Sequence, residues 1–142
     1  MASIRKPYAA LESVPDQVQD YAALYYLQQN SFTTAHVQLL RATSQLKDYV
    51  LAKILHLTPK TFAKYAEVET TIKKDTQEHM LLLTALYKHG SSVFESTQNF
   101  NKWLKTANLF FDNQEPITFL DTITGIRFVD DRLTALEYGD NV

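Results

Sequence analysis

The chain has 142 residues, a length that fits one domain or two very small ones. Hydrophobic residues make up 45% and charged residues 21% of the sequence, which is the composition of a globular protein and not of a disordered one. The absence of cysteine excludes disulfides, thiolate metal sites and a cysteine nucleophile. With 3 glycines and 4 prolines, the chain also lacks the glycine-rich loops that hold nucleotide phosphates.

No apolar run approaches the roughly 20 residues that span a bilayer, and the first residues lack the apolar stretch of a signal peptide. We therefore expect a soluble, cytoplasmic protein. The net charge is −1 over residues 1–30, +3 over residues 31–90 and −4 over residues 91–142. A positive middle and an acidic end indicate two surfaces with different partners, although differences of this size also arise by chance.

Apolar residues at helical spacing, separated by short capped junctions, predict a mainly α fold. Ser13 and Asp16 are spaced as a helix start with Pro15 in the first turn, and this first helix should end at Asn30. A second helix should follow residues 31–34, where Ser and Thr provide a capping side chain.

A third helix should begin near Thr43 and reach Leu55, since apolar residues recur on one face of that segment. Thr58 is expected to cap the next helix. Pro59 would be its first residue, a position where proline loses no hydrogen bond.

Asp75 and Glu78 are spaced as the start of a long apolar helix. Gly90 should close that helix in the left-handed conformation. Beyond this glycine the apolar segments become shorter and more aromatic, and residues 100–104 predict one short helix.

Pro116 should open another helix, which Gly125 is expected to end. The last predicted helix covers residues 128–136 and stops at Gly139. The apolar stretch of residues 109–111 is consistent with a short strand or with a buried loop.

Residues 48–67 fit the helix-turn-helix template, in which two helices cross steeply through a tight turn. The template needs a small residue at its fifth position, which is Ala52, and apolar residues at five others, which are Leu51, Leu55, Leu57, Phe62 and Tyr65. Its ninth position usually holds glycine because the backbone there has a positive φ. This chain has His56 at that position.

Such a motif would present the second of its helices to DNA. The candidate DNA contacts are Lys53, Thr58, Lys60, Thr61 and Lys64. No arginine occurs between residues 42 and 126, which argues against bidentate reading of guanine. The alternative is an αα corner of a helical bundle that does not touch DNA.

The remaining polar residues give weaker signals. The four histidines, His36, His56, His79 and His89, lack the spacing of a metal motif, so we expect surface or capping roles and no metal site. Asp130 and Asp131 would diverge by about 100° on a helix, which favours a solvated helix N-terminus over an acid/base pair. Tyr21, Tyr25 and Tyr26 are expected in the core or in a dimer interface.

The second half carries an ordered pattern of about ten positions: Phe94, Trp103-Leu104, Pro116, Leu120, Thr122, Gly125, Val129, Leu133 and Tyr138-Gly139. This pattern resembles the toxin-binding domain of Xre/MbcA/ParS-type antitoxins. The segment from Leu57 to Phe62 also resembles the helix-turn-helix of that family, so the similarity covers residues 43–142. Two features depart from it: no glycine occurs in residues 109–115, and Ile123 stands where the family often has an acidic residue.

The resemblance implies the antitoxin of a type II toxin–antitoxin pair, whose toxin has a RES domain and consumes NAD. Antitoxins of this family cover the NAD pocket of the toxin with their C-terminal end, and as homodimers they bind operator DNA and repress their own operon. The chain itself would then be no enzyme and would need no cofactor and no small-molecule substrate.

By the same resemblance, Trp103 and Leu133 are expected in the core, and Gly125 is expected to stop a helix and so to place Ile126 and Arg127. The candidate toxin contacts are Arg127, Arg132, Glu137, Tyr138, Gly139, Asp140, Asn141 and Val142. Acidic groups of this tail could occupy the site of the NAD pyrophosphate.

Three segments follow from this interpretation: N-terminal helices at residues 1–42 that could dimerise, an Xre-like helix-turn-helix domain at 43–92 and a toxin-binding domain at 93–142. Two alternatives stay open. The chain could be a stand-alone helix-turn-helix regulator with a C-terminal dimerisation or sensing domain, or an interaction protein whose helix-turn-helix is only structural. An enzyme is disfavoured because no cluster of titratable groups has a suitable spacing.

Overall fold

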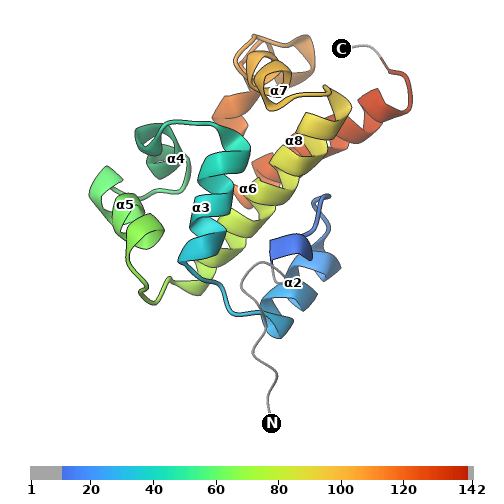
Figure 1. The fold of residues 1–142 in the computed structure, drawn as a ribbon. Coiled ribbons are helices and arrows are strands. Elements are labelled where there is room, and N and C mark those ends of the chain that lie inside the picture. Colours follow the sequence, from blue (N-terminus) through green and yellow to red (C-terminus); the bar gives the residue numbers. More distant parts are fainter. Residues whose placement is uncertain (1–10, 141–142) are drawn as a thin grey trace.

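The computed structural model describes residues 11–140. This part of the chain forms seven α-helices, two short 3-10 helices and no strand (Figure 1), which confirms the mainly α fold. The elements are α2 (Asp20–Gln29), α3 (Thr34–Ser44), α4 (Asp48–Ile54), α5 (Pro59–Glu67), α6 (Lys74–Val93), α7 (Thr97–Leu104), η1 (Leu109–Phe111), η2 (Pro116–Phe119) and α8 (Ile123–Glu137). Between residues 11 and 140 no helix has the length and apolar content needed to cross a bilayer.

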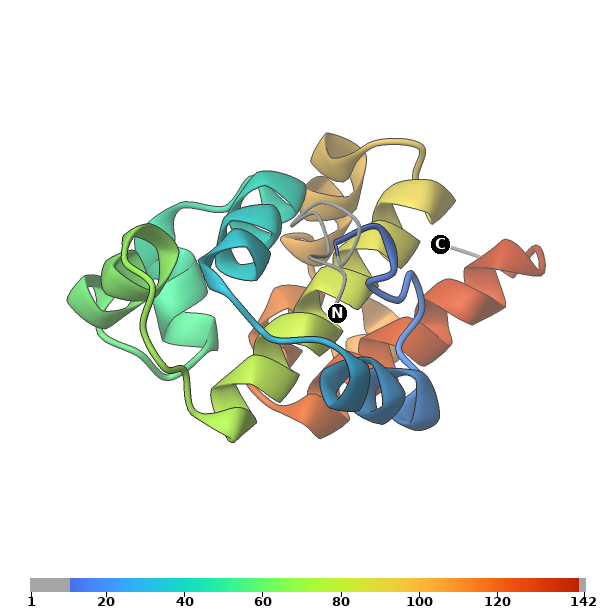
Figure 2. The same ribbon diagram turned by 60° about the horizontal axis from the view of Figure 1, so that its bottom comes forward.

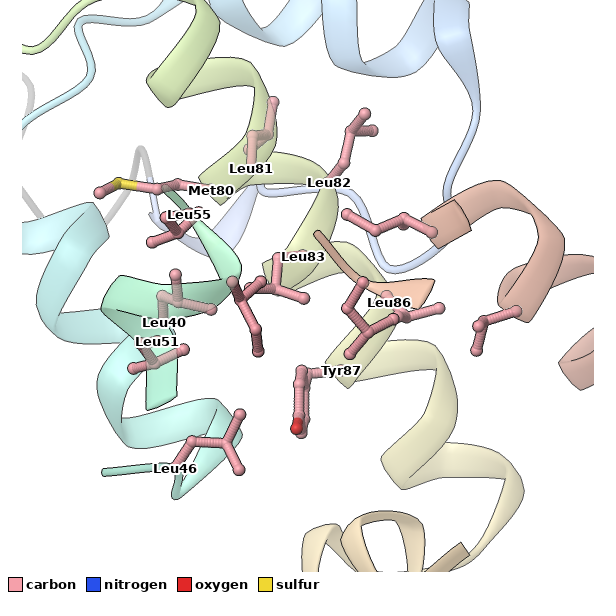
Figure 3. Close-up of a cluster of buried hydrophobic side chains, with 14 of the residues drawn as sticks. Leu40, Leu46, Leu51, Leu55, Met80, Leu81, Leu82, Leu83, Leu86 and Tyr87 are labelled. Carbon is pink, nitrogen blue, oxygen red and sulfur yellow. The ribbon is translucent and has the colours of Figure 1, made fainter. Parts of the chain in front are cut away.

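Helix α6 is the centre of the fold. It has 20 residues and packs against α3 on one side and α8 on another, with α2 and α7 completing its surroundings (Figures 1 and 2). Every residue from His79 to Tyr87 is buried, as is expected for the middle of a helix that other elements surround. Figure 3 shows leucines of α6, with Leu40 of α3 and Leu51 of α4, in one cluster of buried side chains.

Polar contacts attach α7 to this centre. The hydroxyl of Tyr87 on α6 donates to Asn101 Oδ1 at 2.6 Å, and Asn101 Nδ2 donates to the backbone oxygen of Ser44 at 2.9 Å. Burial raises the pKa of Tyr87, so its hydroxyl keeps its proton and remains a donor. Asn101 thereby links α7 to both α6 and the end of α3.

The predicted start of the first helix at Ser13 is wrong, whereas its predicted end at Asn30 is confirmed. Helix α2 begins only at Asp20. Val14 stands before Pro15, and a residue in that place is driven away from the helical conformation. Val14 is buried instead, and its backbone oxygen accepts a hydrogen bond from Lys88 Nζ on α6 at 3.1 Å.

The predicted start of a helix near Thr43 is also wrong, because α3 continues through Thr43 to Ser44 and α4 begins at Asp48. Gln45 ends α3 in the left-handed conformation, with φ 55°. The buried Ser44 Oγ accepts from the Leu46 backbone N–H at 3.2 Å, which favours a turn over a continued helix.

Two glycines that were expected to end helices lie inside helices instead. Gly90 is followed by a further turn of α6, which ends at Val93, and a Cβ at Gly90 would lie 2.3 Å from the Phe100 ring. Gly125 lies in the first turn of α8, where a Cβ would lie 1.7 Å from the Phe119 backbone oxygen. Both positions therefore need glycine for close packing and not for a left-handed turn.

Other boundaries differ in smaller ways. Asp75 lies in the first turn of α6, and Lys73 occupies the capping position that the sequence assigned to the aspartate. Pro116 opens a 3-10 helix that ends at Phe119. Residues 109–111 form a 3-10 helix and not a strand. The segment is not a buried loop either, because only Phe111 is buried. The predicted stop at Gly139 is confirmed by its φ of 89°.

Candidate functional site

Helices α4 and α5 are joined by a tight turn at residues 55–57, and this turn is the first candidate surface. His56 has a φ of 59°, so the left-handed backbone that the template requires is present without glycine. The Leu57 backbone N–H donates to the Ala52 backbone oxygen at 2.8 Å, and Ala52 is buried. A small side chain at Ala52 therefore lets the turn fold back onto α4.

The cap of α5 is built as predicted. Thr58 Oγ1 accepts from the Thr61 backbone N–H at 3.1 Å, and Thr58 also donates its hydroxyl hydrogen to Thr61 Oγ1 at 2.9 Å. Pro59 is the first residue of α5, as the sequence indicated. Thr58 thus caps α5 in the free protein, and Thr61 is its partner in the cap.

The three candidate lysines are exposed but do not form one cluster. Lys60 and Lys64 are four residues apart on α5, so they share one face of that helix. Lys53 lies on α4 and lines a groove of about 430 Å³ between α4 and η2. At the template's apolar positions Leu51, Leu55 and Phe62 are buried, and Leu57 and Tyr65 are half-buried.

Two histidines, His56 in this turn and His79 in α6, contact the residues just before α8. His56 Nε2 lies 2.7 Å from the Asp121 backbone oxygen, and His79 Nε2 lies 2.9 Å from the Leu120 backbone oxygen. A carbonyl oxygen only accepts, so Nε2 carries a hydrogen on both rings. Burial of His79 is the main cause that lowers its pKa, which is consistent with a neutral ring.

The face of α8 that meets α6 holds a charged cluster around the buried His89 and Asp130. His89 Nδ1 lies 2.6 Å from Asp130 Oδ1, and His89 Nε2 lies 2.6 Å from Glu137 Oε1. Burial alone would lower the pKa of His89, but the hydrogen bonds and charges of Asp130 and Glu137 raise it above 6.5 overall. The imidazolium donates to both carboxylates and so fixes the second half of α8 on α6.

This cluster corrects two expectations. Asp130 is not at a solvated helix N-terminus, because it is buried in the middle of α8, and only Asp131 is exposed. The histidines were expected on the surface or as caps, but His79 and His89 are buried inside the fold. His36 does have a capping role, since its Nδ1 accepts from the Thr33 backbone N–H at 3.0 Å, although it too is buried.

The outer face of α8 meets η1 and forms the second candidate surface. A groove of about 250 Å³ is lined by residues of both elements, Phe110, Phe111, Phe128, Asp131, Arg132 and Ala135. The Arg132 guanidinium lies 3.5 Å from the centre of the Phe110 ring, and Arg132 Nη1 donates to Asp140 Oδ2 at 2.8 Å. Arg132 thus joins η1, α8 and the C-terminal tail.

The candidate toxin contacts fall into separate groups. Tyr138 is exposed, and Gly139 turns the chain so that Asp140 reaches Arg132. Glu137 is directed to His89. Arg127 is half-buried and lines a hollow shared with Leu24 of α2 and Glu78 of α6, away from Arg132. Asn141 and Val142 lie outside the described residues.

Aromatic side chains support this surface from inside. Trp103 and Leu133 are buried, which confirms their expected place in the core. The Trp103 ring packs against Phe94 and Phe111, and Phe111 packs edge-on against Phe128 with ring centres 5.1 Å apart. Residues 11–140 contain no group of three His, Asp or Glu side chains arranged to hold a metal ion.

Sequence reasoning did not single out Leu109, Phe110 and Phe128 as surface residues, because their apolar character favours burial. It also missed the pairing of His89 with Asp130. These two residues are 41 positions apart, so no local spacing rule could connect them.

Part of the chain matches a known protein family. Residues 89–139 match the family model of the antitoxin Xre/MbcA/ParS C-terminal toxin-binding domain. The matched range begins at His89 in α6 and ends at Gly139, so it contains α7, η1, η2 and α8. The match confirms the resemblance seen in the order of the aromatic, proline and glycine positions. No curated protein matches the chain.

Proposed function

We propose that this chain, which carries a toxin-binding domain at residues 89–139, is the antitoxin of a type II toxin–antitoxin pair. The partner would be a RES-domain toxin that consumes NAD. The observation that carries the proposal is the family match over α7, η1, η2 and α8. The charge of the second half supports it as well, because a basic pocket that binds the NAD pyrophosphate would attract an acidic segment.

Neutralisation would work by occlusion. The pairs that buried His89 makes with buried Asp130 and with the more exposed Glu137 fix α8 on the core, so the chain leaves the body of the protein at a defined point. Tyr138, Gly139 and Asp140, followed by residues 141–142, would then cover the NAD pocket of the toxin. Occlusion needs shape and charge complementarity and no reacting group, so the chain would not be an enzyme.

Autorepression would use α4 and α5 as a helix-turn-helix. Lys60, Thr61 and Lys64 would face the DNA, with Thr58 at the helix start and Lys53 as a further phosphate contact. Lysines hold phosphates but read bases less specifically than arginines do. A cytoplasmic homodimer would supply the second half-site and the affinity that a single lysine-based surface lacks.

The test is expression of the neighbouring reading frame in a host, with and without this chain, while growth and cellular NAD are followed. The proposal expects the neighbour alone to stop growth and deplete NAD, and this chain to restore both. A neighbour that is harmless, or whose toxicity this chain does not relieve, would reject the antitoxin role. A neighbour that stops growth at constant NAD would reject only the NAD-consuming class of toxin.

A second candidate is a stand-alone helix-turn-helix regulator. The left-handed turn at His56 and the capped start of α5 favour it, because both belong to the candidate DNA surface. Such a regulator would bind its operator tightly without any toxin. Selection of DNA sequences by the purified chain, followed by addition of the neighbouring protein, separates this candidate from the antitoxin.

A further inference from the structure

Four large apolar side chains are exposed on the outer side of the toxin-binding domain. Leu109 is 78% exposed, Phe110 50%, Phe128 47% and Tyr138 85%. We call these four residues, three aromatic and one leucine, the aromatic patch. Scattered apolar side chains on a surface are ordinary, but a contiguous exposed patch marks an interaction site.

The patch is built around one groove, with Leu109 and Tyr138 at the ends of the two elements that form it. Phe110 and Phe128 line the same groove between η1 and α8. Phe128, Arg132 and Ala135 are spaced four and three residues apart, which places them on one face of α8. Tyr138 is the residue that follows α8, three positions beyond Ala135. Leu109 precedes Phe110 in η1.

Arg132 connects the patch to the tail. Its side chain is only 10% exposed, because its guanidinium lies against the Phe110 ring and pairs with Asp140. The same side chain therefore supports Phe110 from beneath and holds Asp140 beside it. A partner that receives the tail meets the aromatic patch at the same time.

The charges around the patch indicate what kind of surface fits it. Asp112 directly follows η1 and is exposed, and Asp131 lines the groove and is exposed. Asp140 adds a third carboxylate at the tail. Between residues 106 and 140 the chain has seven acidic and two basic side chains. The complementary surface is an apolar recess bordered by basic side chains.

We infer that the aromatic patch is the docking surface for the toxin, and that an apolar, basic-rimmed surface next to the toxin's active site receives it before or while the tail covers the pocket. This inference rests on the proposed antitoxin function and adds to it the surface that holds the toxin. Exposed aromatic residues at the centre of an interface typically carry most of the binding energy. The patch therefore supplies affinity, and the tail supplies occlusion.

The first test compares two double variants in their affinity for the purified protein of the neighbouring reading frame. Leu109→Ser with Phe110→Ser removes half of the aromatic patch, and Tyr21→Ser with Tyr25→Ser removes similar exposed side chains from α2 as a matched control. The patch variant should bind about 30-fold more weakly, which corresponds to the loss of a binding hot spot. The control should bind within about threefold of the wild type.

Footprinting by hydroxyl radicals on the unmodified chain avoids any effect of substitution on folding. Oxidation of Phe110, Phe128 and Tyr138 should fall in the complex, whereas Tyr21 and Tyr25 should react as in the free chain.

Charge reversal at the rim, Asp131→Lys, should weaken binding by about tenfold, since it places a lysine opposite basic residues of the partner.

Several outcomes would overturn the inference. Unchanged affinity of the patch variant, unchanged oxidation of Phe110 in the complex, or an equal loss of affinity in the α2 control would each do so. If the free chain is a dimer that the patch variant dissociates, the patch joins two copies of the chain instead. Failure of the unmodified chain to bind the neighbouring protein at all would reject the antitoxin proposal itself, which distinguishes the two results.

Discussion

At the scale of single residues, His89 has the largest influence on how the C-terminal helix is held. Both of its ring nitrogens face carboxylates at 2.6 Å, one from the middle of α8 and one from its end. Burying the His89 cation beside the Asp130 carboxylate is far less costly than burying either charge alone. Loss of one partner would leave an unpaired buried group, so the three residues should behave as a unit.

The first prediction concerns pH. Because the pKa of folded His89 lies above 6.5, its pairing contributes stability fully below about pH 6.5, the usual pKa of the unfolded residue. That contribution is lost as pH rises through the raised pKa of the folded state. Urea titrations measure the free energy of unfolding of the wild type and of His89→Gln. The difference between the two should be largest near pH 6 and smaller at pH 9.

The comparison with His89→Gln removes the effect of the other histidines. Burial lowers the pKa of His36 to about 4 and also lowers that of His79, so their contributions change in the opposite direction, being lost as pH falls below 6.5. The wild type and His89→Gln share those contributions, which therefore cancel in the difference. A stability difference that stays constant from pH 6 to pH 9 would show that His89 is not charged in the folded protein.

At the scale of elements, apolar spacing was enough to predict that helices occupy most of the chain, but not where each begins and ends. Local signals located the cap at Thr58 and the stop at Gly139. They failed at Gly90 and Gly125, because these glycines accommodate Phe100 and the Phe119 backbone, which come from other elements. A glycine selected by tertiary contact has the same appearance in a sequence as one selected by a turn.

The candidate site could be predicted only in part for the same reason. The domain match and the residues of the α4–α5 turn follow from ordered motifs along the chain. The aromatic patch arises where η1 meets α8, and the pairing of His89 with Asp130 joins α6 to α8. Neither exists until those elements pack, and exposed phenylalanines contradict the ordinary rule that apolar residues are buried.

The second prediction concerns the α4–α5 turn. His56 has the left-handed conformation, which costs a residue other than glycine about 1–2 kcal/mol. Its ring also donates to the Asp121 backbone oxygen. His56→Ala loses that hydrogen bond and keeps the backbone cost, whereas His56→Gly loses the bond and removes the cost. His56→Gly should therefore be about 1 kcal/mol more stable than His56→Ala in urea unfolding. Equal stability of the two variants would contradict a left-handed turn in solution.

At the scale of the whole molecule, the two candidate surfaces lie at opposite ends. Figures 1 and 2 both show α4 and α5 at one side and the C-terminal end of α8 at the other. Helix α8 connects the two regions, since its start is held by His56 and His79 and its end by His89. Substitutions confined to one surface should leave the function of the other intact.

The third prediction tests the DNA surface. Lys60→Ala with Lys64→Ala should weaken DNA binding and reduce its dependence on salt, because each neutralised phosphate adds to that dependence. For about five phosphates contacted by a dimer, wild-type affinity should fall by roughly 10²- to 10³-fold between 50 and 200 mM salt. Fluorescence anisotropy with operator DNA measures both quantities. An unchanged salt slope in the variant would remove these lysines from the interface.

The fourth prediction tests the tail. Deletion of residues 140–142 removes the pairing of Asp140 with Arg132, and because the Asp140 side chain is 50% exposed this pairing contributes at most about 1 kcal/mol. The truncated chain should therefore keep its unfolding midpoint within a few degrees and bind DNA as the wild type does, while it fails to restore growth against the toxin. The lysine variant of the α5 surface is the matched control, since it should restore growth and lose DNA binding. Full rescue by the truncated chain would mean that the aromatic patch alone blocks the toxin, and that occlusion does not require the tail beyond Gly139.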